Sequence, residues 1–217
     1  MEMAEIKAII YDFDGVIVDS REANRTYYNR LLKHFGLTEV QEGHLEAIYT
    51  RTSREVIELL FADPDMAEAA RTVEKSMSND DITPLITVEP YVRETLTLLR
   101  RRYRTAIATN RGKSLSLVLA YNKLTDYFDM TVSSSQVSRP KPHPDCLQII
   151  LEKYSLAPSQ VVYVGDAEID ARLASAAGVP FIAYKNPNLS AWAHLDDHRE
   201  MWEILNRDGQ ELDWSKM

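Results

Sequence analysis

Acidic side chains occur at short spacings at two places in this chain. One pair is separated only by Phe13 and the other pair spans one helical turn, and the four residues are Asp12, Asp14, Asp166 and Asp170. Carboxylates that are brought together repel one another unless a cation lies between them, and hard oxygen ligands favour Mg²⁺. We therefore treat these residues as candidate ligands of Mg²⁺, which binds one or two carboxylates together with a substrate phosphate.

A hydroxyl, an amide and a lysine lie between the two acidic pairs, at Thr109, Asn110 and Lys141. A lysine and a hydroxyl can bind and neutralise the charged oxygens of a phosphoryl group. Two neighbouring acids can then divide the reaction, with Asp12 attacking phosphorus and Asp14 giving a proton to the leaving oxygen. The residue types are consistent with Mg²⁺-dependent phosphoryl transfer through an aspartyl phosphate.

Each of these features also has an ordinary structural explanation. Asp14-Gly15 between apolar runs is a β-hairpin signal, Thr109-Asn110 can cap a helix, and Lys141 can be a solvated lysine. Gly165-Asp166 can be a simple turn, and Asp170 can face solvent on a helix. These explanations do not account for the shared position of the candidates, because all of them follow predicted strands.

The elements that must position these residues alternate along the chain. Short apolar runs predict strands at Ile6–Tyr11, Thr105–Thr109, Met130–Ser133, Val161–Val164 and Phe181–Tyr184. Helical periodicity fills most of the stretches between them, as in Val92–Arg102 and Pro144–Tyr154. Runs that are apolar on both faces suit a parallel sheet covered by helices. We therefore expect an α/β fold with a doubly wound parallel sheet, whose ligands gather at the carboxyl ends of the strands.

Residues 19–84 interrupt the alternation. Their apolar periodicity is helical throughout and predicts helices at Asn24–Phe35, Gln41–Tyr49, Ser53–Phe61 and Ala67–Met77. The stretch ITPLITVEP, which contains two prolines, marks the return linker. We therefore predict a small helical domain of residues 19–84, inserted into an α/β core of residues 1–18 and 85–217.

The ordered set DFDGV, ATN, RPKPHPD and GDAEID resembles the four motifs of the haloacid dehalogenase superfamily. The helical insertion resembles the cap of the subgroup that includes phosphoglycolate phosphatases and β-phosphoglucomutases. The resemblance extends to about Tyr184 and implies a Rossmann-like core, a helical cap and Mg²⁺ as the cofactor.

The resemblance also implies a role for each motif residue. Asp12 matches the nucleophile that becomes phosphorylated, and Asp14 matches the general acid and base. Thr109 matches the hydroxyl that binds the transferring phosphoryl group, with Asn110 beside it. Lys141 matches the lysine that neutralises the nucleophile and the phosphate.

The resemblance also implies roles for the residues of the last motif and for the turn after Asp14. Asp166 matches the carboxylate that holds Mg²⁺ together with Asp12 and the backbone carbonyl of Asp14. Asp170 matches the acid that supports the metal site or the lysine. Gly15 would permit a tight turn, and Val16–Val18 would form a small hairpin leading into the cap.

An acid at position 14 favours phosphate esters as substrates, because the dehalogenases that this chain resembles lack it. We expect a phosphatase that acts on a small phosphorylated metabolite. The alternatives are a sugar-phosphate mutase similar to β-phosphoglucomutase, and a non-catalytic binding protein on the same fold. In the cap loop YTRTSREV, Arg51 is a candidate for binding an anionic group and Ser53 for donating a hydrogen bond; otherwise Arg51 is solvated and Ser53 caps a helix.

Composition restricts the setting. Thirty-three acidic against 25 basic residues give a net charge of −8 without a basic stripe, which weighs against nucleic acid as the main partner. No apolar run of about 18 residues predicts a membrane span, and the N-terminus does not resemble a signal peptide. The lone cysteine, Cys146, indicates a reducing compartment, most simply the cytoplasm. The oligomeric state is not indicated.

The tail from Asn186 contains three tryptophans, Trp192, Trp202 and Trp214. A helical pattern at Asp197–Asn206 predicts a final helix that packs on the core. The alternative is a surface for self-association, since exposed tryptophan is a frequent interface anchor.

Overall fold

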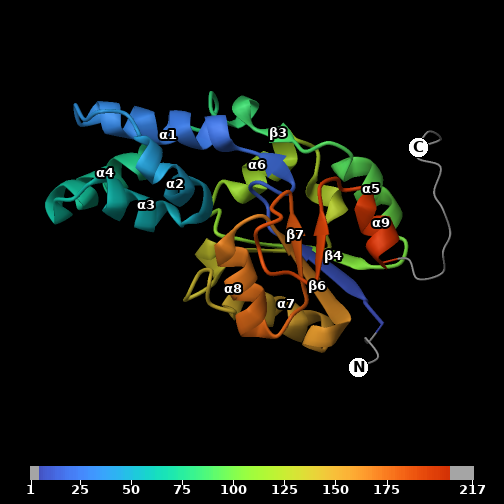
Figure 1. The fold of residues 1–217 in the computed structure, drawn as a ribbon. Helices are drawn as coiled ribbons and strands as arrows, with labels where there is room; N and C mark the ends of the chain where they lie inside the picture. The colour runs from blue at the N-terminus through green and yellow to red at the C-terminus, as the bar shows by residue number, and fades with distance from the viewer. Residues whose placement is uncertain (1–4, 206–217) are drawn as a thin grey trace.

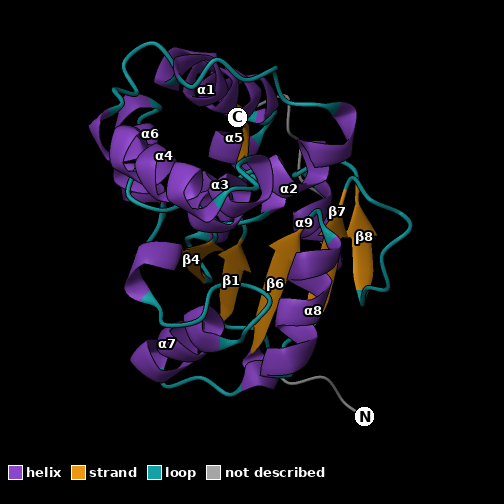
Figure 2. Ribbon diagram, turned by 90° about the vertical axis from the view of Figure 1, so that its left-hand side faces the viewer, coloured by secondary structure: helices purple, strands orange, loops and turns teal. Residues whose placement is uncertain are grey.

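The computed structural model describes residues 5–205 and is built around a six-stranded sheet. The strand order is β5-β4-β1-β6-β7-β8, and every neighbouring pair is parallel. The strands are β1 (Ala8–Tyr11), β4 (Arg104–Thr109), β5 (Met130–Ser133), β6 (Val161–Gly165), β7 (Phe181–Tyr184) and β8 (Ala193–Leu195). The five strands expected from apolar runs are confirmed, and β8 is an additional edge strand (Figure 2).

Helices cover both faces of the sheet, as doubly wound folds require. Alternate residues of β1 point to opposite faces, so Ile9 and Tyr11 join one buried cluster while Ala8 and Ile10 join the other. The first cluster includes side chains of α5 (Val92–Leu99), α6 (Leu115–Tyr121) and α9 (Glu200–Leu205). The second includes side chains of α7 (Asp145–Tyr154) and α8 (Glu168–Ala177), and Figure 1 shows α7 and α8 on the opposite side of the sheet from α5. The predicted fold class is confirmed.

Four helices between β2 and β3 lie together beside the sheet, and we call them the cap helices (Figure 1). They are α1 (Arg21–His34), α2 (Leu45–Thr50), α3 (Ser53–Leu60) and α4 (Pro64–Ser76). Their apolar faces form a separate buried cluster that includes Leu31, Val56 and Phe61. Helix α4 begins three residues before the predicted start, because the Asp63 carboxylate accepts from the N–H groups of Asp65 and Met66. The division into two domains at residues 19 and 84 stays a prediction.

Two short strands join the cap helices to the core. β2 (Val18–Asp19) leaves the core and pairs antiparallel with β3 (Thr87–Val88), which returns to it. The Gly15 N–H donates to the Val18 carbonyl at 2.8 Å, which closes a tight turn after Asp14. The hairpin was expected within Val16–Val18. The tight turn is present, but Val18 pairs with Val88 of β3, on the linker that returns from the cap helices.

The tail contributes to both the sheet and its covering layer. α9 begins at Glu200, three residues after the predicted start, and buries Met201 and Trp202 on the core. Trp192 is 41% exposed, and Trp214 lies outside the described residues. Within residues 5–205, no helix is long and apolar enough to cross a membrane.

Candidate active site

The carboxylates converge where the sheet changes its winding direction. The connection after β1 leads to β4 on one side, whereas the connection after β6 leads to β7 on the other, and sheets of this kind bind ligands at the carboxyl ends of the strands beside such a reversal. Asp12 follows β1, and Asp166 follows β6. Carboxylate oxygens of Asp12, Asp166 and Asp170 lie within 4.8 Å of one another, so the structure brings together these three predicted residues.

Lys141 joins two of these acids. Its Nζ lies 2.6 Å from Oδ1 of Asp12 and 2.8 Å from Oδ1 of Asp170, and its side chain is 2% exposed. Burial alone would lower the pKa of Lys141, but the two carboxylates outweigh it and raise the pKa. Lys141 therefore stays charged, and it is not the solvated lysine of the ordinary explanation.

Asp170 is held by donors on both of its oxygens. The Tyr163 hydroxyl donates to Oδ1 at 2.8 Å, and the Ala167 N–H donates to Oδ2 at 3.2 Å. Tyr163 is a functional residue that the sequence reasoning missed, although a tyrosine in a buried strand directly before an acidic motif is a recognisable signal. Because its oxygens are already engaged, Asp170 suits the role of holding Lys141 better than that of a direct metal ligand.

Asp12 and Asp166 carry the strongest evidence of a cation site. Burial raises the pKa of Asp12 to about 7, against the opposing effect of Lys141. Burial, followed by the charges of Asp170 and Asp12, raises the pKa of Asp166 to about 8. Burying two ionised carboxylates is unfavourable, and a divalent cation bound between them would offset this free-energy cost. Their hard oxygen atoms fit Mg²⁺. The residues present therefore fit the expected cofactor.

Gly15 shapes the wall of this cation site. Its φ of +82° lies in the left-handed region, and a Cβ built there would sit 2.2 Å from Oδ2 of Asp166. Only a glycine lets the turn after Asp14 and the Asp166 carboxylate approach so closely.

Asp14 is fixed by two donor side chains, Ser20 and Arg111. The Ser20 hydroxyl donates to Oδ1 at 2.5 Å. The Arg111 guanidinium donates from Nη2 to Oδ1 at 2.5 Å and from Nε to Oδ2 at 2.9 Å, with both side chains nearly buried. Arg111 is the second functional residue that the sequence reasoning missed. It directly follows Thr109-Asn110, so a search one residue further past this strand end would have found it.

Thr109 and Asn110 lie at the end of β4, and both are buried. Thr109 Oγ1 accepts from the Arg111 N–H at 3.1 Å. The Asn110 Oδ1 accepts from the Lys141 N–H at 3.0 Å, and its Nδ2 donates to the Thr50 carbonyl of α2 at 3.0 Å. Asn110 thus connects the lysine loop with the cap helices, which is more than a helix cap would do.

The cap candidates lie in different environments. Arg51 is exposed at the C-terminal end of α2. The Ser53 hydroxyl donates to Oε1 of Glu74 at 2.6 Å, so it is engaged within the cap helices. The residue that caps α3 is Thr52, which exchanges hydrogen bonds with Glu55. The alternative in which Ser53 serves as the cap is therefore wrong, and substrate binding by Arg51 and Ser53 stays a prediction.

The tail also touches the turn that carries Asp14. The Nε2 atom of His198 lies 2.7 Å from the Val16 carbonyl oxygen, so this ring N–H donates to it. Burial lowers the pKa of His198 to about 4, so the ring is neutral. Nothing in the local sequence indicates this contact.

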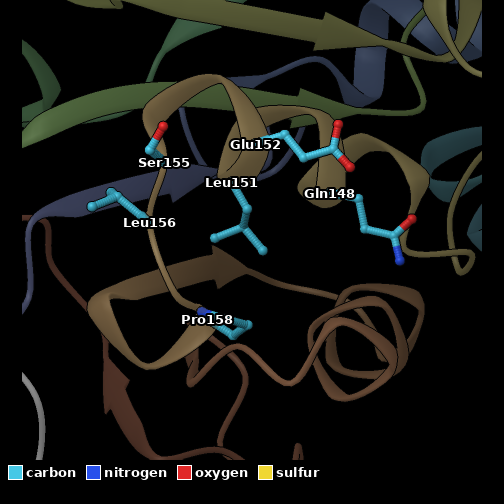
Figure 3. A pocket seen from close by; sticks show the side chains of 6 residues that line it. All are labelled: Gln148, Leu151, Glu152, Ser155, Leu156 and Pro158. Atoms are coloured by element: carbon cyan, nitrogen blue, oxygen red, sulfur yellow. The ribbon is translucent and has the colours of Figure 1, made fainter.

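A surface hollow lies near the amino end of β6, the end opposite to the carboxylates, where η5 (Pro158–Gln160) precedes this strand. Its lining is Gln148, Leu151, Glu152, Ser155, Leu156 and Pro158 (Figure 3). Its lining contains one carboxylate, Glu152, and none of the acidic residues that converge at the carboxyl ends of the strands.

Comparison with known proteins agrees with this geometry. Residues 9–184 match the family model described as haloacid dehalogenase-like hydrolase. A phosphoglycolate phosphatase of Nitrosospira multiformis is 31% identical over 185 residues, which cover 80% of this chain and 80% of that protein. A fructose-1-phosphate phosphatase of Escherichia coli is 28% identical over 182 residues, which cover 79% of this chain and 92% of that protein.

Solved structures show the same architecture. The crystal structure of a hydrolase of the same superfamily from Geobacter sulfurreducens superposes with a TM-score of 0.76 at 37% identity. The alignment covers 92% of this chain and 96% of that one, so the similarity includes the cap helices as well as the sheet.

Proposed function

Because this chain belongs to the haloacid dehalogenase-like hydrolase family, we propose that it is a phosphatase that hydrolyses a small phosphorylated metabolite through an aspartyl phosphate. The observation that carries the proposal is the buried contact among Asp12, Lys141 and Asp170 beside Asp166. The names of the relatives, phosphoglycolate phosphatase and fructose-1-phosphate phosphatase, support a small phosphorylated substrate.

In the first proposed step, a carboxylate oxygen of Asp12 attacks phosphorus and the bond from phosphorus to the ester oxygen breaks. Asp14 gives its proton to that leaving oxygen. Lys141 faces Asp12 at 2.6 Å and offsets the negative charge that gathers as nucleophile and phosphate meet. The Thr109 hydroxyl, at the neighbouring strand end, binds a phosphoryl oxygen.

In the second step, water attacks the phosphorus atom of the aspartyl phosphate. Asp14 takes a proton from this water, the bond between phosphorus and the Asp12 oxygen breaks, and inorganic phosphate leaves. Both carboxylates then return to their starting states. The Ser20 bond keeps Asp14 oriented throughout the cycle.

Asp12, Asp166 and the backbone carbonyl of Asp14 are the proposed Mg²⁺ ligands, and Asp170 supports Lys141. When bound, the ion supplies charge neutralisation for Asp12 and for the phosphate oxygens. Burial raises the pKa of both Asp12 and Asp166, and a divalent cation would offset the unfavourable burial of their ionised forms, which supports this assignment.

The experiment is an assay of phosphate release from a panel of small phosphate esters, with Mg²⁺ and with EDTA. We expect release that requires Mg²⁺ and is abolished in Asp12→Asn. A mutase would return no free phosphate, and a binding protein would leave every ester intact, so the same assay separates the three activities.

The proposed location is the cytoplasm. Cys146 is buried and is the chain's sole cysteine, so it forms no internal disulfide. Nucleic acid is not a proposed partner, because the net charge is −8. Cell fractionation with an antibody against the chain tests the location.

A further inference from the structure

Arg111 lies beside Asp14, the group that protonates the leaving oxygen in the proposed reaction. Its guanidinium contacts both oxygens of Asp14, and Asp14 is the proposed proton donor to the ester oxygen. The part of the substrate attached to that oxygen must therefore lie beside Asp14, within reach of the Arg111 guanidinium. This step rests on the proposed function.

The other buried cation of the site is committed elsewhere. Lys141 faces Asp12 and Asp170, on the side of the nucleophile. Without Arg111, a leaving group with its own negative charge would be buried beside Asp14 with no cation facing it, because Lys141 is paired with Asp12 and Asp170. Arg111 is thus placed to decide whether the site tolerates a charged leaving group.

Arg111 is also braced so that it can exchange partners without moving far. Its Nη1 donates to the Ser114 hydroxyl at 3.2 Å, and its guanidinium lies 5.7 Å from the centre of the Phe13 ring. Asp14 in turn keeps its bond from Ser20 when Arg111 lets go. Both partners therefore remain held while the guanidinium turns to a second carboxylate.

We propose that Arg111 selects substrates with a carboxylate two or three bonds from the ester oxygen, by transferring its paired hydrogen bonds from Asp14 to the substrate. The planar fork of arginine matches a carboxylate in the two-bond geometry that Asp14 now occupies. A short phosphorylated hydroxy acid fits this requirement, whereas a neutral phosphorylated alcohol leaves the salt bridge between Arg111 and Asp14 in place.

The test compares two esters of equal length, 2-phosphoglycolate and 2-hydroxyethyl phosphate, which differ in one carboxylate. We expect the unmodified protein to favour 2-phosphoglycolate in kcat/KM. Arg111→Gln, which keeps donors but removes the charge, should reduce this preference by about 10- to 100-fold, as for the loss of a charge-assisted pair. Arg111→Lys should retain part of it.

Arg54→Ala is the matched control, because it removes an equal charge from an exposed arginine of the cap helices. The preference should stay within about twofold in this variant. Circular dichroism and the melting temperature report whether each variant is folded. Competitive inhibition of the unmodified protein by glycolate, compared with ethylene glycol, examines the same contact without any substitution, and glycolate should inhibit more strongly.

Three results would overturn the assignment. One is an unmodified protein that hydrolyses both esters equally, with no stronger inhibition by glycolate. Another is an equal loss of kcat/KM on both esters in Arg111→Gln, which would make Arg111 a positioning residue for Asp14 alone. The third is loss of the preference in Arg51→Ala but not in Arg111→Gln. Absence of phosphate release from any ester would instead refute the proposed function itself.

Discussion

Lys141 forms ion pairs with two buried carboxylates at once, those of Asp12 and Asp170. Taking away one partner of a buried ion pair leaves charge without compensation, and this cost commonly exceeds the net value of the pair. Lys141 therefore contributes to the stability of the fold in addition to its proposed role in catalysis.

Lys141→Met should lower the free energy of unfolding by about 3 to 5 kcal/mol at pH 8 in EDTA, because Asp12 and Asp170 lose their counter-ion. Urea unfolding measures this change. Arg139→Met is the control, since its bond to Asp145 is exposed and should contribute less than about 1 kcal/mol. Equal effects of the two substitutions would contradict the account.

Gly15→Ala should weaken Mg²⁺ binding by about tenfold or more, because a new Cβ would displace the Asp166 carboxylate. Left-handed strain adds about 1 to 2 kcal/mol of destabilisation. A Mg²⁺ titration of phosphate release measures the affinity. Gly43→Ala is the control, because no atom lies within 4 Å of its Cβ position. An unchanged titration curve in Gly15→Ala would argue against Asp166 as a ligand.

At the scale of elements, the tail acts on the turn between β1 and the cap helices. His198 precedes α9, donates to the Val16 carbonyl and packs against the Tyr184 ring at a tilt of 36°, with ring centres 4.6 Å apart. The turn that it contacts carries Asp14 and leads to β2. A segment far from the motifs thus fixes where the proposed proton donor stands.

His198→Ala should cost about 2 to 4 kcal/mol of stability, because it leaves a buried carbonyl without a donor and opens a cavity against Tyr184. It should also lower kcat more than it raises KM, since Asp14 loses its support. The control is His194→Ala, whose ring contacts the Leu189 carbonyl at the surface of the same tail. Equal melting temperatures for the two variants would be evidence against this role.

The elements themselves were predictable to different degrees. Five strands were found because runs that are apolar on both faces, such as Val161–Val164, have few alternatives to a parallel sheet. β8 was missed because Ala193–Leu195 is short and includes the exposed His194. α1 starts at Arg21 rather than Asn24, because polar first turns carry no apolar periodicity.

The convergence of the site was predictable, but its partners were not. Parallel strands end at one edge, which is why Asp12, Lys141 and Asp166 could be grouped from chain order alone. The bond between Arg111 and Asp14 depends on how loops after β1 and β4 approach each other, and no local pattern records this distance. Whether Arg51 faces the substrate depends on how the cap helices are oriented relative to the core, which the sequence does not encode locally.

At the scale of the whole molecule, the buried carboxyl groups of Asp12 and Asp166 make stability depend on pH. In the metal-free fold the pKa values of Asp12 and Asp166 are about 7 and about 8, well above the usual value for an unfolded chain. The folded state therefore binds more protons than the unfolded state between about pH 4 and pH 8, so its stability falls as the pH rises through this window.

Mg²⁺ should reverse this loss by keeping both carboxylates ionised in the fold. We expect saturating Mg²⁺ to raise the melting temperature by about 5 to 10 °C at pH 8 and by far less at pH 5, where protons compete for the ligands. Differential scanning calorimetry in Mg²⁺ and in EDTA measures the shift. A shift of equal size at both pH values would contradict the cation site.

The most direct test of the central claim is the release of inorganic phosphate by the unmodified protein and by Asp12→Asn, measured on 2-phosphoglycolate and a panel of other small phosphate esters with Mg²⁺ present. We predict release by the unmodified protein and a loss of at least about a thousandfold in Asp12→Asn, because an amide is a much weaker nucleophile than a carboxylate. Undiminished release by the variant, or none by the unmodified protein from any ester, would contradict the account.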